Sequence, residues 1–177
     1  MVGRHNNKIT DSPMSLQARL IKAVTRRTIK RSGLNEQQLV RHLRKVFNDT
    51  PVLTLLPRGV TLSRVQQPAF TGDRISVEQP SMTVLYSHGG AYIGGITKTY
   101  HNLAGRLAKK LNAEVFLPVY PFAPEHPYPA AVNRVMEAYE YLLSLGKEPQ
   151  DIVIAGDSAG GGLTLATLLH IRDKGLE

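Results

Sequence analysis

The chain has 177 residues, a net charge of +8 and no cysteine. Its apolar content of 42% is enough for a hydrophobic core in one domain with an appendage. The absence of thiols excludes a disulfide framework, a thiolate zinc site and a cysteine nucleophile. No metal-binding cluster or cofactor motif stands out, so we expect neither a metal nor a cofactor.

The first eleven residues, MVGRHNNKITD, lack the apolar stretch of a secretion signal. No other run approaches the ~20 apolar residues that a membrane helix needs. We therefore expect no stable membrane insertion and a cytoplasmic location. Nothing in the pattern specifies the oligomeric state.

The positive charge is confined to the N-terminal region. Residues 1–48 hold 11 Lys and Arg against 2 Asp and Glu, whereas residues 49–177 hold 11 against 12. No interleaved aromatic residues and no helix-turn-helix or RNA-binding signature accompany the basic residues. The pattern is typical of a solvated helical face, and we expect no nucleic-acid partner. A basic interaction module restricted to residues 1–48 is a weaker alternative, which predicts salt-sensitive binding by that segment.

Two amphipathic helices are predicted in this region. Over residues 15–31, apolar residues recur at helical spacing and basic residues fill the other face: Leu16, Leu20, Ile21 and Val24. A second helix begins at Asn35, with Gln38 at the capping-box position. These helices either pack as an ordinary pair or form a lid over an active site, and the sequence leaves both readings open.

After the prolines at positions 51 and 57, the hydrophobic period changes from helical to strand-like. Strands are predicted over residues 60–65, 74–78, 82–87, 113–120 and 151–155. Helices are predicted from about Tyr100 to Leu111, from Pro129 to a stop at Gly146, and from about Ser158 onward. From Met82 the order is strand, helix, strand, helix, strand, helix. This order predicts an α/β fold with a parallel sheet covered on both faces.

The pentapeptide GDSAG, residues 156–160, lies where the last strand gives way to the last helix. A serine hydroxyl is a weak nucleophile unless it is exposed, oriented and next to a base. Gly156 and Gly160 permit a turn too tight for a Cβ, which lifts Ser158 above the sheet. The N–H of Ala159, at the positive end of a helix, then faces the position of a developing oxyanion. The pattern predicts a nucleophile elbow.

A second glycine-rich loop, SHGGAYIGG at residues 87–95, follows a predicted strand. Gly89 and Gly90 let their N–H groups approach an alkoxide and complete an oxyanion hole with Ala159. A phosphate-binding loop is disfavoured because Ile96 stands where the lysine is required. The elbow also lacks the second glycine of a dinucleotide fingerprint.

These two loops and the stretch YPFAPEHPYPAA, residues 120–131, resemble the hormone-sensitive-lipase-like branch of the α/β-hydrolases, which includes acetyl esterases and other carboxylesterases. The similarity covers about residues 60–177. It implies that residues 51–177 are the N-terminal portion of an α/β-hydrolase domain, incomplete after the elbow helix. Residues 1–50 then correspond to a helical cap or arm.

The resemblance implies a serine carboxylesterase that cleaves short- to medium-chain acyl esters through an acyl-enzyme, with a small-molecule ester as its partner. Ser158 is then the nucleophile, and Gly89, Gly90 and Ala159 are the oxyanion donors.

Three further residues are candidates for bracing the loop or lining the pocket: His88, Tyr92 and Glu125. Two departures from the family pattern stand out. Ala91 replaces a third glycine, and Pro121 with Phe122 replaces an Arg–Leu pair.

The remaining triad residues are missing from the expected positions. In this fold the acid and the histidine follow the serine in the chain, yet 19 residues follow Ser158. His170 is 12 residues farther along the same predicted helix, about 18 Å away, and cannot reach. We expect the acid and base beyond residue 177 and little activity from this chain alone. The alternative is a non-catalytic ligand-binding protein on a hydrolase scaffold, as in the plant gibberellin receptors of this family.

Overall fold

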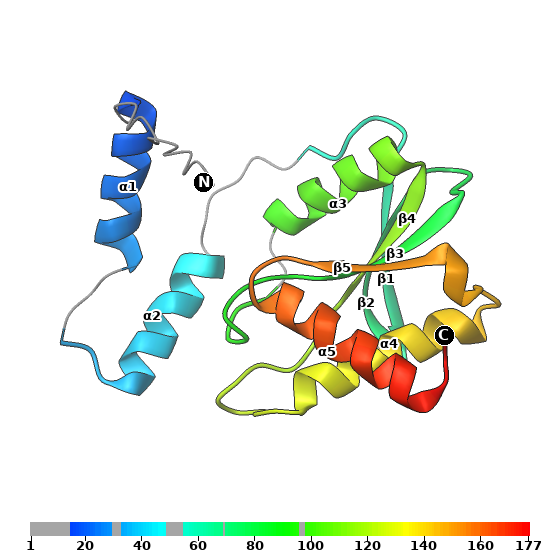
Figure 1. The fold of residues 1–177 in the computed structure, drawn as a ribbon. Coiled ribbons are helices and arrows are strands. Elements are labelled where there is room, and N and C mark those ends of the chain that lie inside the picture. The colour runs from blue at the N-terminus through cyan, green and yellow to red at the C-terminus, as the bar shows by residue number, and fades with distance from the viewer. Residues whose placement is uncertain (1–14, 30–32, 49–54, 69, 96–97) are drawn as a thin grey trace, which may run out of the picture. The chain divides into compact units, whose positions relative to one another are not determined.

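The computed structural model describes residues 15–29, 33–48, 55–68, 70–95 and 98–177 (Figure 1). The chain forms two compact units, Met1–Leu39 and Val40–Glu177. The boundary falls inside the second helix, so the last turns of that helix belong to the larger unit. Residues 1–14, 30–32, 49–54, 69 and 96–97 lie outside the description, and they include the proline at position 51 and the end of the first predicted helix.

Both predicted N-terminal helices are present: α1 is Leu16–Ile29 and α2 is Glu36–Asn48. The capping box at the start of α2 is confirmed, because Gln38 N–H donates to Asn35 Oδ1 at 2.9 Å and Asn35 N–H donates to Gln38 Oε1 at 3.1 Å. These two bonds satisfy backbone donors that have no partner within the helix. Leu16 and Leu20 are exposed, whereas the side chains of Ile21 and Val24 lie outside the description.

The larger unit is built on a five-stranded sheet with the strand order β1-β2-β4-β3-β5. The strands are β1 (Thr61–Gln67), β2 (Phe70–Ser76), β3 (Met82–Ser87), β4 (Ala113–Pro118) and β5 (Ile152–Gly156). β3 pairs in parallel with β4 and β5, as the alternating order predicted, while β1 and β2 add antiparallel strands on one side. The predicted α/β fold is confirmed, and the antiparallel pairs of β1 and β2 make the sheet a mixed one.

The prediction for β2 was wrong at its start. The alternation suggested residues 74–78, but the strand begins at Phe70 because a buried stretch precedes the alternating one. Gly72 lies there against β4, where an added Cβ would approach Leu117 O to 2.3 Å. The next residue, Asp73, is buried and bonded to Arg64 and His101. Neither a glycine nor an aspartate is typical of strands, so the sequence concealed this half of β2.

Helices cover both faces of the sheet, and each face has its own core (Figure 1). α3 (Lys98–Leu111) packs on one face, over Val84 and Val115. α4 (Ala130–Ser144) and α5 (Ala159–Lys174) pack on the other, over Leu85 and Phe116. Consecutive strand residues thus serve opposite cores, as the period of two requires. None of the helices in the described part of the chain combines the length and apolar character needed to cross a membrane.

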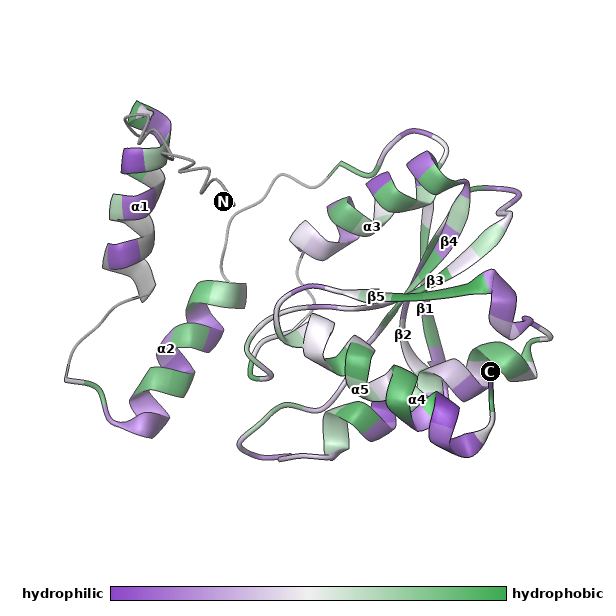
Figure 2. Ribbon diagram, viewed as in Figure 1, coloured by the Kyte–Doolittle hydropathy of each residue, from purple (hydrophilic) through white to green (hydrophobic). Residues whose placement is uncertain are grey.

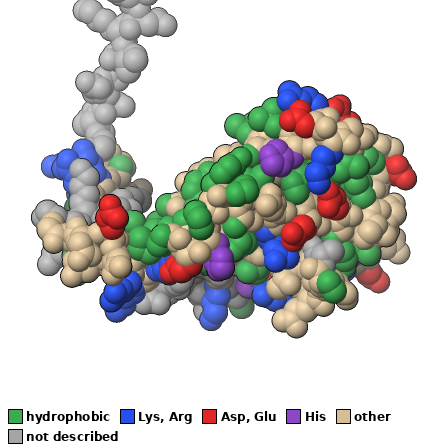
Figure 3. Space-filling model, turned by 90° about the horizontal axis from the view of Figure 1, so that it is seen from below, with side chains coloured by type: hydrophobic (Ala, Val, Ile, Leu, Met, Phe, Trp, Pro, Cys, Tyr) green, Lys and Arg blue, Asp and Glu red, His purple; other side chains and the backbone are tan. Residues whose placement is uncertain are grey.

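Apolar surface remains exposed around β5 and α5. In the described residues β5 is an edge strand of the sheet, and it is hydrophobic along its length (Figure 2). Val153 on β5 and Leu165 on α5 are 44% and 66% exposed. Apolar side chains also reach the surface over the face drawn in Figure 3. An unpaired apolar edge of this kind favours association with another strand or surface.

Candidate active site

Ser158 lies at a sharp turn between β5, which ends at Gly156, and α5, which begins at Ala159. Its backbone has φ 51° and ψ −121°, a conformation that residues other than glycine rarely adopt. The residue is exposed, and its hydroxyl does not cap the helix that it precedes. The strained turn therefore leaves the Ser158 hydroxyl free to react with a molecule outside the sheet.

The two glycines that flank the serine are required by close backbone contacts. A Cβ on Gly160 would lie 1.9 Å from Ser87 O, and one on Gly156 would lie 2.4 Å from Gly160 O. Neither carbonyl oxygen can move away without a shift of the main chain, because both belong to the backbone. The elbow thus packs directly on the end of β3, where the second glycine-rich loop begins.

That second loop, residues 88–95, is folded tightly on itself. The N–H groups of Ile93 and Gly94 both donate to Gly90 O at 2.9 Å. Gly90 has φ 131°, and both Ala91 and Tyr92 have left-handed backbone, with φ 53° and 60°. Consecutive left-handed residues other than glycine raise the free energy of the folded loop, so contacts with the surrounding structure must hold it in this shape.

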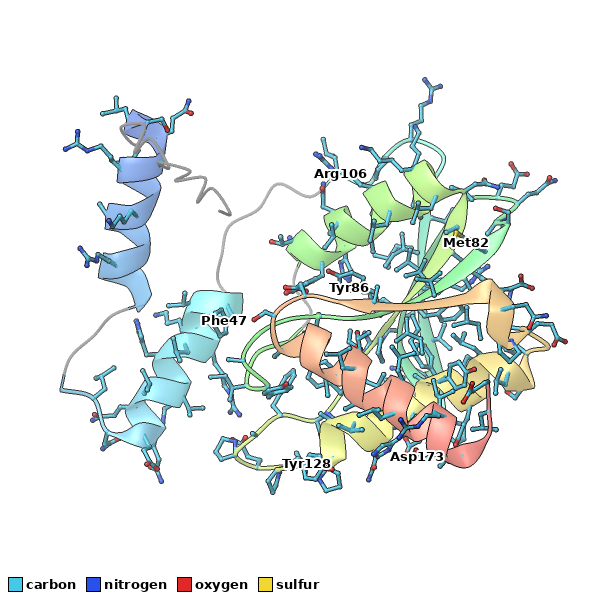
Figure 4. All side chains as sticks on the ribbon, viewed as in Figure 1. Phe47, Met82, Tyr86, Arg106, Tyr128 and Asp173 are labelled. Carbon is cyan, nitrogen blue, oxygen red and sulfur yellow. The ribbon has the colours of Figure 1, made fainter. Side chains whose placement is uncertain are left out.

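Asp157 connects the elbow to this loop. Its carboxylate accepts from Gly89 N–H at 3.0 Å, from Tyr86 OH at 3.2 Å and from Tyr100 OH at 3.1 Å. Tyr86 projects from the end of β3 between the sheet and α3 (Figure 4). Burial, together with the negative charge of Asp157, raises the pKa of Tyr86 and raises that of Tyr100 to about 12. Both hydroxyls therefore stay protonated and donate to the carboxylate.

The expectation of a free Gly89 amide does not hold in this structure. Its N–H donates to Asp157 and to Tyr100 OH, at 3.0 and 2.9 Å, and so already has two acceptors within the protein. In the described residues, no acceptor takes the N–H groups of Gly90, Ala91 or Ala159. From the sequence, Ala91 stood out as the replacement for a third glycine, but its N–H was not named among the candidate donors.

His88 is part of the scaffold. It is fully buried and stacked on Tyr120 with a centroid separation of 4.2 Å. Its Nδ1 lies 2.7 Å from Gly89 O and must carry the proton, because a carbonyl can only accept. Burial lowers the pKa of His88, so the ring is neutral. It fixes the backbone of the loop rather than presenting a base to Ser158.

Tyr92 lines a pocket beside the elbow. The pocket has a volume of about 320 Å³ and a mostly apolar wall, which the 121–132 segment and the start of α5 complete. The hydroxyl of Tyr92 lies close to Gly162, where an added Cβ would approach it to 2.5 Å. His126 and Tyr128 supply polar groups on the same wall. Gly162 is one turn of α5 beyond the serine, so the pocket adjoins the elbow.

Glu125 is exposed and forms a two-point ion pair with Arg44 of α2. The hydrogen bonds from Arg44 lower the pKa of Glu125 to about 2. Sequence reasoning named Glu125 but missed its partner, which lies 81 residues earlier in a helix of different predicted role.

Among the described residues, no histidine or carboxylate forms a hydrogen bond with the Ser158 hydroxyl. His170 belongs to the continuous helix α5, 12 residues after Ser158, which corresponds to about 18 Å. His88 is buried and stacked on Tyr120, and the carboxylate of Asp157 accepts hydrogen bonds from three donors. The described residues therefore supply a presented hydroxyl and free backbone donors.

Comparisons with known proteins agree with this geometry. Residues 84–177 match the α/β-hydrolase fold family. An acetyl-hydrolase of Streptomyces hygroscopicus is 35% identical over 157 residues, covering 79% of this chain and 52% of that protein. A crystal structure of EstE5, soaked with p-nitrophenyl butyrate, superposes with a TM-score of 0.77 at 30% identity, covering 92% of this chain and 54% of that one. A hormone-sensitive lipase from a metagenome library gives 0.72 at 31% identity, covering 94% and 55%.

The chain spans about half the length of the relatives that it matches. The family match covers more than half of the chain and includes the elbow and the whole 88–95 loop. The names of the relatives agree with the predicted class of carboxylic ester hydrolase. The chain therefore belongs to the α/β-hydrolase family, on the branch that includes acetyl-hydrolases and hormone-sensitive lipases.

Proposed function

We propose that this chain carries the nucleophile and the oxyanion hole of a serine carboxylesterase. The observation that carries the proposal is the exposed Ser158, held in left-handed backbone at the end of β5 beside unoccupied N–H groups. The donors in this proposal are Gly90, Ala91 and Ala159, while Gly89 ties the loop to Asp157. One donor from the elbow and two from the loop satisfy an oxyanion from separate directions.

In the proposed reaction, Ser158 Oγ attacks the ester carbonyl carbon as its proton passes to a histidine. The carbonyl π-electrons move to oxygen, and the three N–H groups stabilise the resulting anion. The carbonyl re-forms as the alcohol leaves with the proton, which gives an acyl-enzyme. Water then attacks the acyl group in the same way, releases the acid and restores Ser158.

We propose that the histidine and its acid come from chain beyond Glu177, in the order that this fold uses. The alternative sources are disfavoured by distance and burial, as described for His170 and His88. Loss of the triad histidine costs about 10⁶ in turnover in the subtilisin precedent, so these 177 residues alone should hydrolyse esters negligibly. No metal or cofactor enters the proposed reaction.

The pocket beside the elbow supports short- to medium-chain acyl esters as substrates. Its volume of about 320 Å³ lies at the lower end of the range of roughly 300–1,000 Å³ for small-molecule sites. Its largely apolar wall suits an uncharged hydrocarbon group. The soaking of EstE5 with p-nitrophenyl butyrate makes that ester a suitable first substrate. A cytoplasmic location and the lack of a nucleic-acid partner remain predictions from the sequence.

A fluorophosphonate probe tests the proposal on the protein extended beyond Glu177. We expect the probe to label the wild type and not Ser158→Ala. Equal labelling of the two proteins would refute the nucleophile assignment. No labelling of the extended wild-type protein, together with no hydrolysis of p-nitrophenyl butyrate, would favour the ligand-binding alternative.

A further inference from the structure

Arg44, on the part of α2 that belongs to the larger unit, contacts two different loops. Its Nε donates to Ile93 O at 2.9 Å, in the loop that carries Gly90. One Nη donates to Ala123 O at 2.9 Å, and the other to Glu125 Oε1 at 2.8 Å. A single planar guanidinium therefore holds two backbone carbonyls and a carboxylate at once, which a lysine cannot do.

Phe47, one turn farther along α2, packs against the same loop. A Cβ on Gly94 would lie 2.9 Å from Phe47 Cδ2 and 3.2 Å from its Cβ. Figure 4 shows Phe47 at the last turn of α2. Helix and loop thus meet without an intervening side chain at position 94. Two neighbouring residues of the loop, Ile93 and Gly94, are each contacted by a different residue of the helix.

These two contacted residues are the ones that fix Gly90. Both Ile93 N–H and Gly94 N–H donate to Gly90 O at 2.9 Å. The carbonyl of Gly90 and the N–H of Ala91 belong to the same peptide unit, and the N–H of Gly90 belongs to the same residue as that carbonyl. A shift of Ile93 and Gly94 would therefore reorient both free donors of the loop.

The loop is also tied to the segment that Arg44 holds on its other side. Ala123 N–H donates to Tyr92 O at 2.9 Å, while Ala123 O accepts from Arg44. The bonds join Arg44, residues 92–93 and Ala123 into a closed ring. Since Ala91 and Tyr92 have left-handed backbone, the loop needs outside contacts of this kind to keep its shape.

We infer that Arg44 is a positioning residue for the oxyanion loop, and that residues 40–48 of α2 are a fixed support of that loop rather than a mobile lid. The role assigned to the loop rests on the proposed function, whereas the contacts by which Arg44 holds the loop do not. The division of the chain between Leu39 and Val40 agrees with the inference, because these turns of α2 group with the hydrolase body. It argues against the lid, one of the two readings that the sequence left open, for this part of α2.

Backbone amide exchange of the 177-residue chain tests the inference, with Arg44→Met as the main variant. Methionine keeps the length of the side chain and removes every donor. Since hydrogen bonds to a charged group are among the stronger ones, we expect amides of Ile93, Gly94 and Ala123 to exchange about tenfold faster than in the wild type. Amides in the α3 core, at Ala104 and Ala108, should keep their rates.

The matched control is Arg41→Met, which removes an exposed guanidinium one turn earlier on the same helix. It should leave the rates of the loop within about twofold of the wild type. Arg44→Lys should rescue the loop incompletely, because one ammonium group cannot reach all three acceptors. Glu125→Gln, which leaves both carbonyl contacts of Arg44 in place, should accelerate exchange less than Arg44→Met.

The titration of Glu125 gives an independent signature of the contact. Followed by its carboxyl ¹³C shift, the pKa of Glu125 should be about 2 in the wild type and should rise in Arg44→Met, while the backbone hydrogen bond to its carboxylate, which does not involve Arg44, still lowers it. Unchanged exchange at Ile93 and Gly94 in Arg44→Met would overturn the inference, as would equal acceleration by Arg41→Met. If Arg44→Met unfolds, unchanged loop exchange in both Arg44→Lys and Glu125→Gln would overturn it instead. Failure of Ser158 labelling would refute the proposed function and leave these exchange results intact.

Discussion

The run of three glycines at the start of α5 allows a prediction in which neighbouring, chemically identical substitutions have opposite effects. In Gly160→Ala, the new Cβ would lie 1.9 Å from Ser87 O and 2.7 Å from His88 O. In Gly161→Ala, the nearest atom, Gly156 O, is 3.6 Å away, which is an ordinary contact. Both glycines lie in the first turn of the same helix.

The expected magnitudes follow from two opposing effects. Alanine is favoured over glycine in a helix by up to about 1 kcal/mol. Overpacking costs about 1–3 kcal/mol, and the backbone carbonyls at position 160 place the cost at the upper end. We therefore expect Gly160→Ala to lower the free energy of unfolding by about 2 kcal/mol. Gly161→Ala should raise it by up to about 1 kcal/mol.

Urea unfolding followed by circular dichroism measures both values. The midpoint should fall for Gly160→Ala and stay level or rise for Gly161→Ala, with the same slope. A Gly160→Ala protein as stable as the wild type would refute the close approach of the elbow to β3. Equal loss of stability in both variants would show that helix geometry, not this contact, requires the glycines.

Three further predictions concern other parts of the molecule. Asp157→Asn removes the charge but keeps the shape, so the pKa of Tyr100, about 12 in the wild type, should fall yet stay above its ordinary value of about 10. Burial is the larger cause and persists, and an ultraviolet absorbance titration measures the change. Acid should destabilise the fold in two stages, each seen as a fall in the urea midpoint. The first stage lies below about pH 6.5, because burial lowers the pKa of His88 in the folded state, so that the unfolded chain binds the proton more readily. The second stage lies below the unfolded pKa of Glu114, about 4.3, because burial alone would raise its pKa but bonds from two cations lower it. Glu114→Gln should reduce this second stage and leave the first unchanged, since the pKa values of Asp73 and Glu125 are also lowered and still contribute. Leu165→Glu, at a site 66% exposed, should reduce self-association measured by sedimentation velocity, and it should change the free energy of unfolding by no more than about 0.5 kcal/mol. Undiminished association would show that this face of α5 does not mediate it.

Local features were predicted well because neighbouring residues encode them. The capping box of Asn35 and Gln38 joins residues three apart, and the structure contains both of its bonds. The alternation of strands and helices from Met82 onward follows from hydrophobic periods of 2 and 3.6. The elbow was predicted for the same reason, since the strand, the glycine pair and the helix are contiguous in the chain.

Predictions that depended on distant partners fared less well. Gly89 was expected to offer its N–H to an oxyanion, but the N–H donates instead to Asp157, 68 residues later. The start of β2 was missed because Gly72 and Asp73 are explained by β4, β1 and α3, which pack around them. No local pattern indicates such partners.

The sequence by itself determined the order of elements, the capped helix and the turn that presents Ser158, because each depends on backbone preferences within a few residues. Tertiary structure alone decided which amides of the 88–95 loop stay free and how the last turns of α2 meet that loop. The Arg44–Glu125 pair joins residues 81 apart, and no preference within a few residues can encode a contact at that separation. The proposed chemistry at Ser158 therefore depends on a short sequence motif for the presented hydroxyl and on the whole packed body for its surroundings.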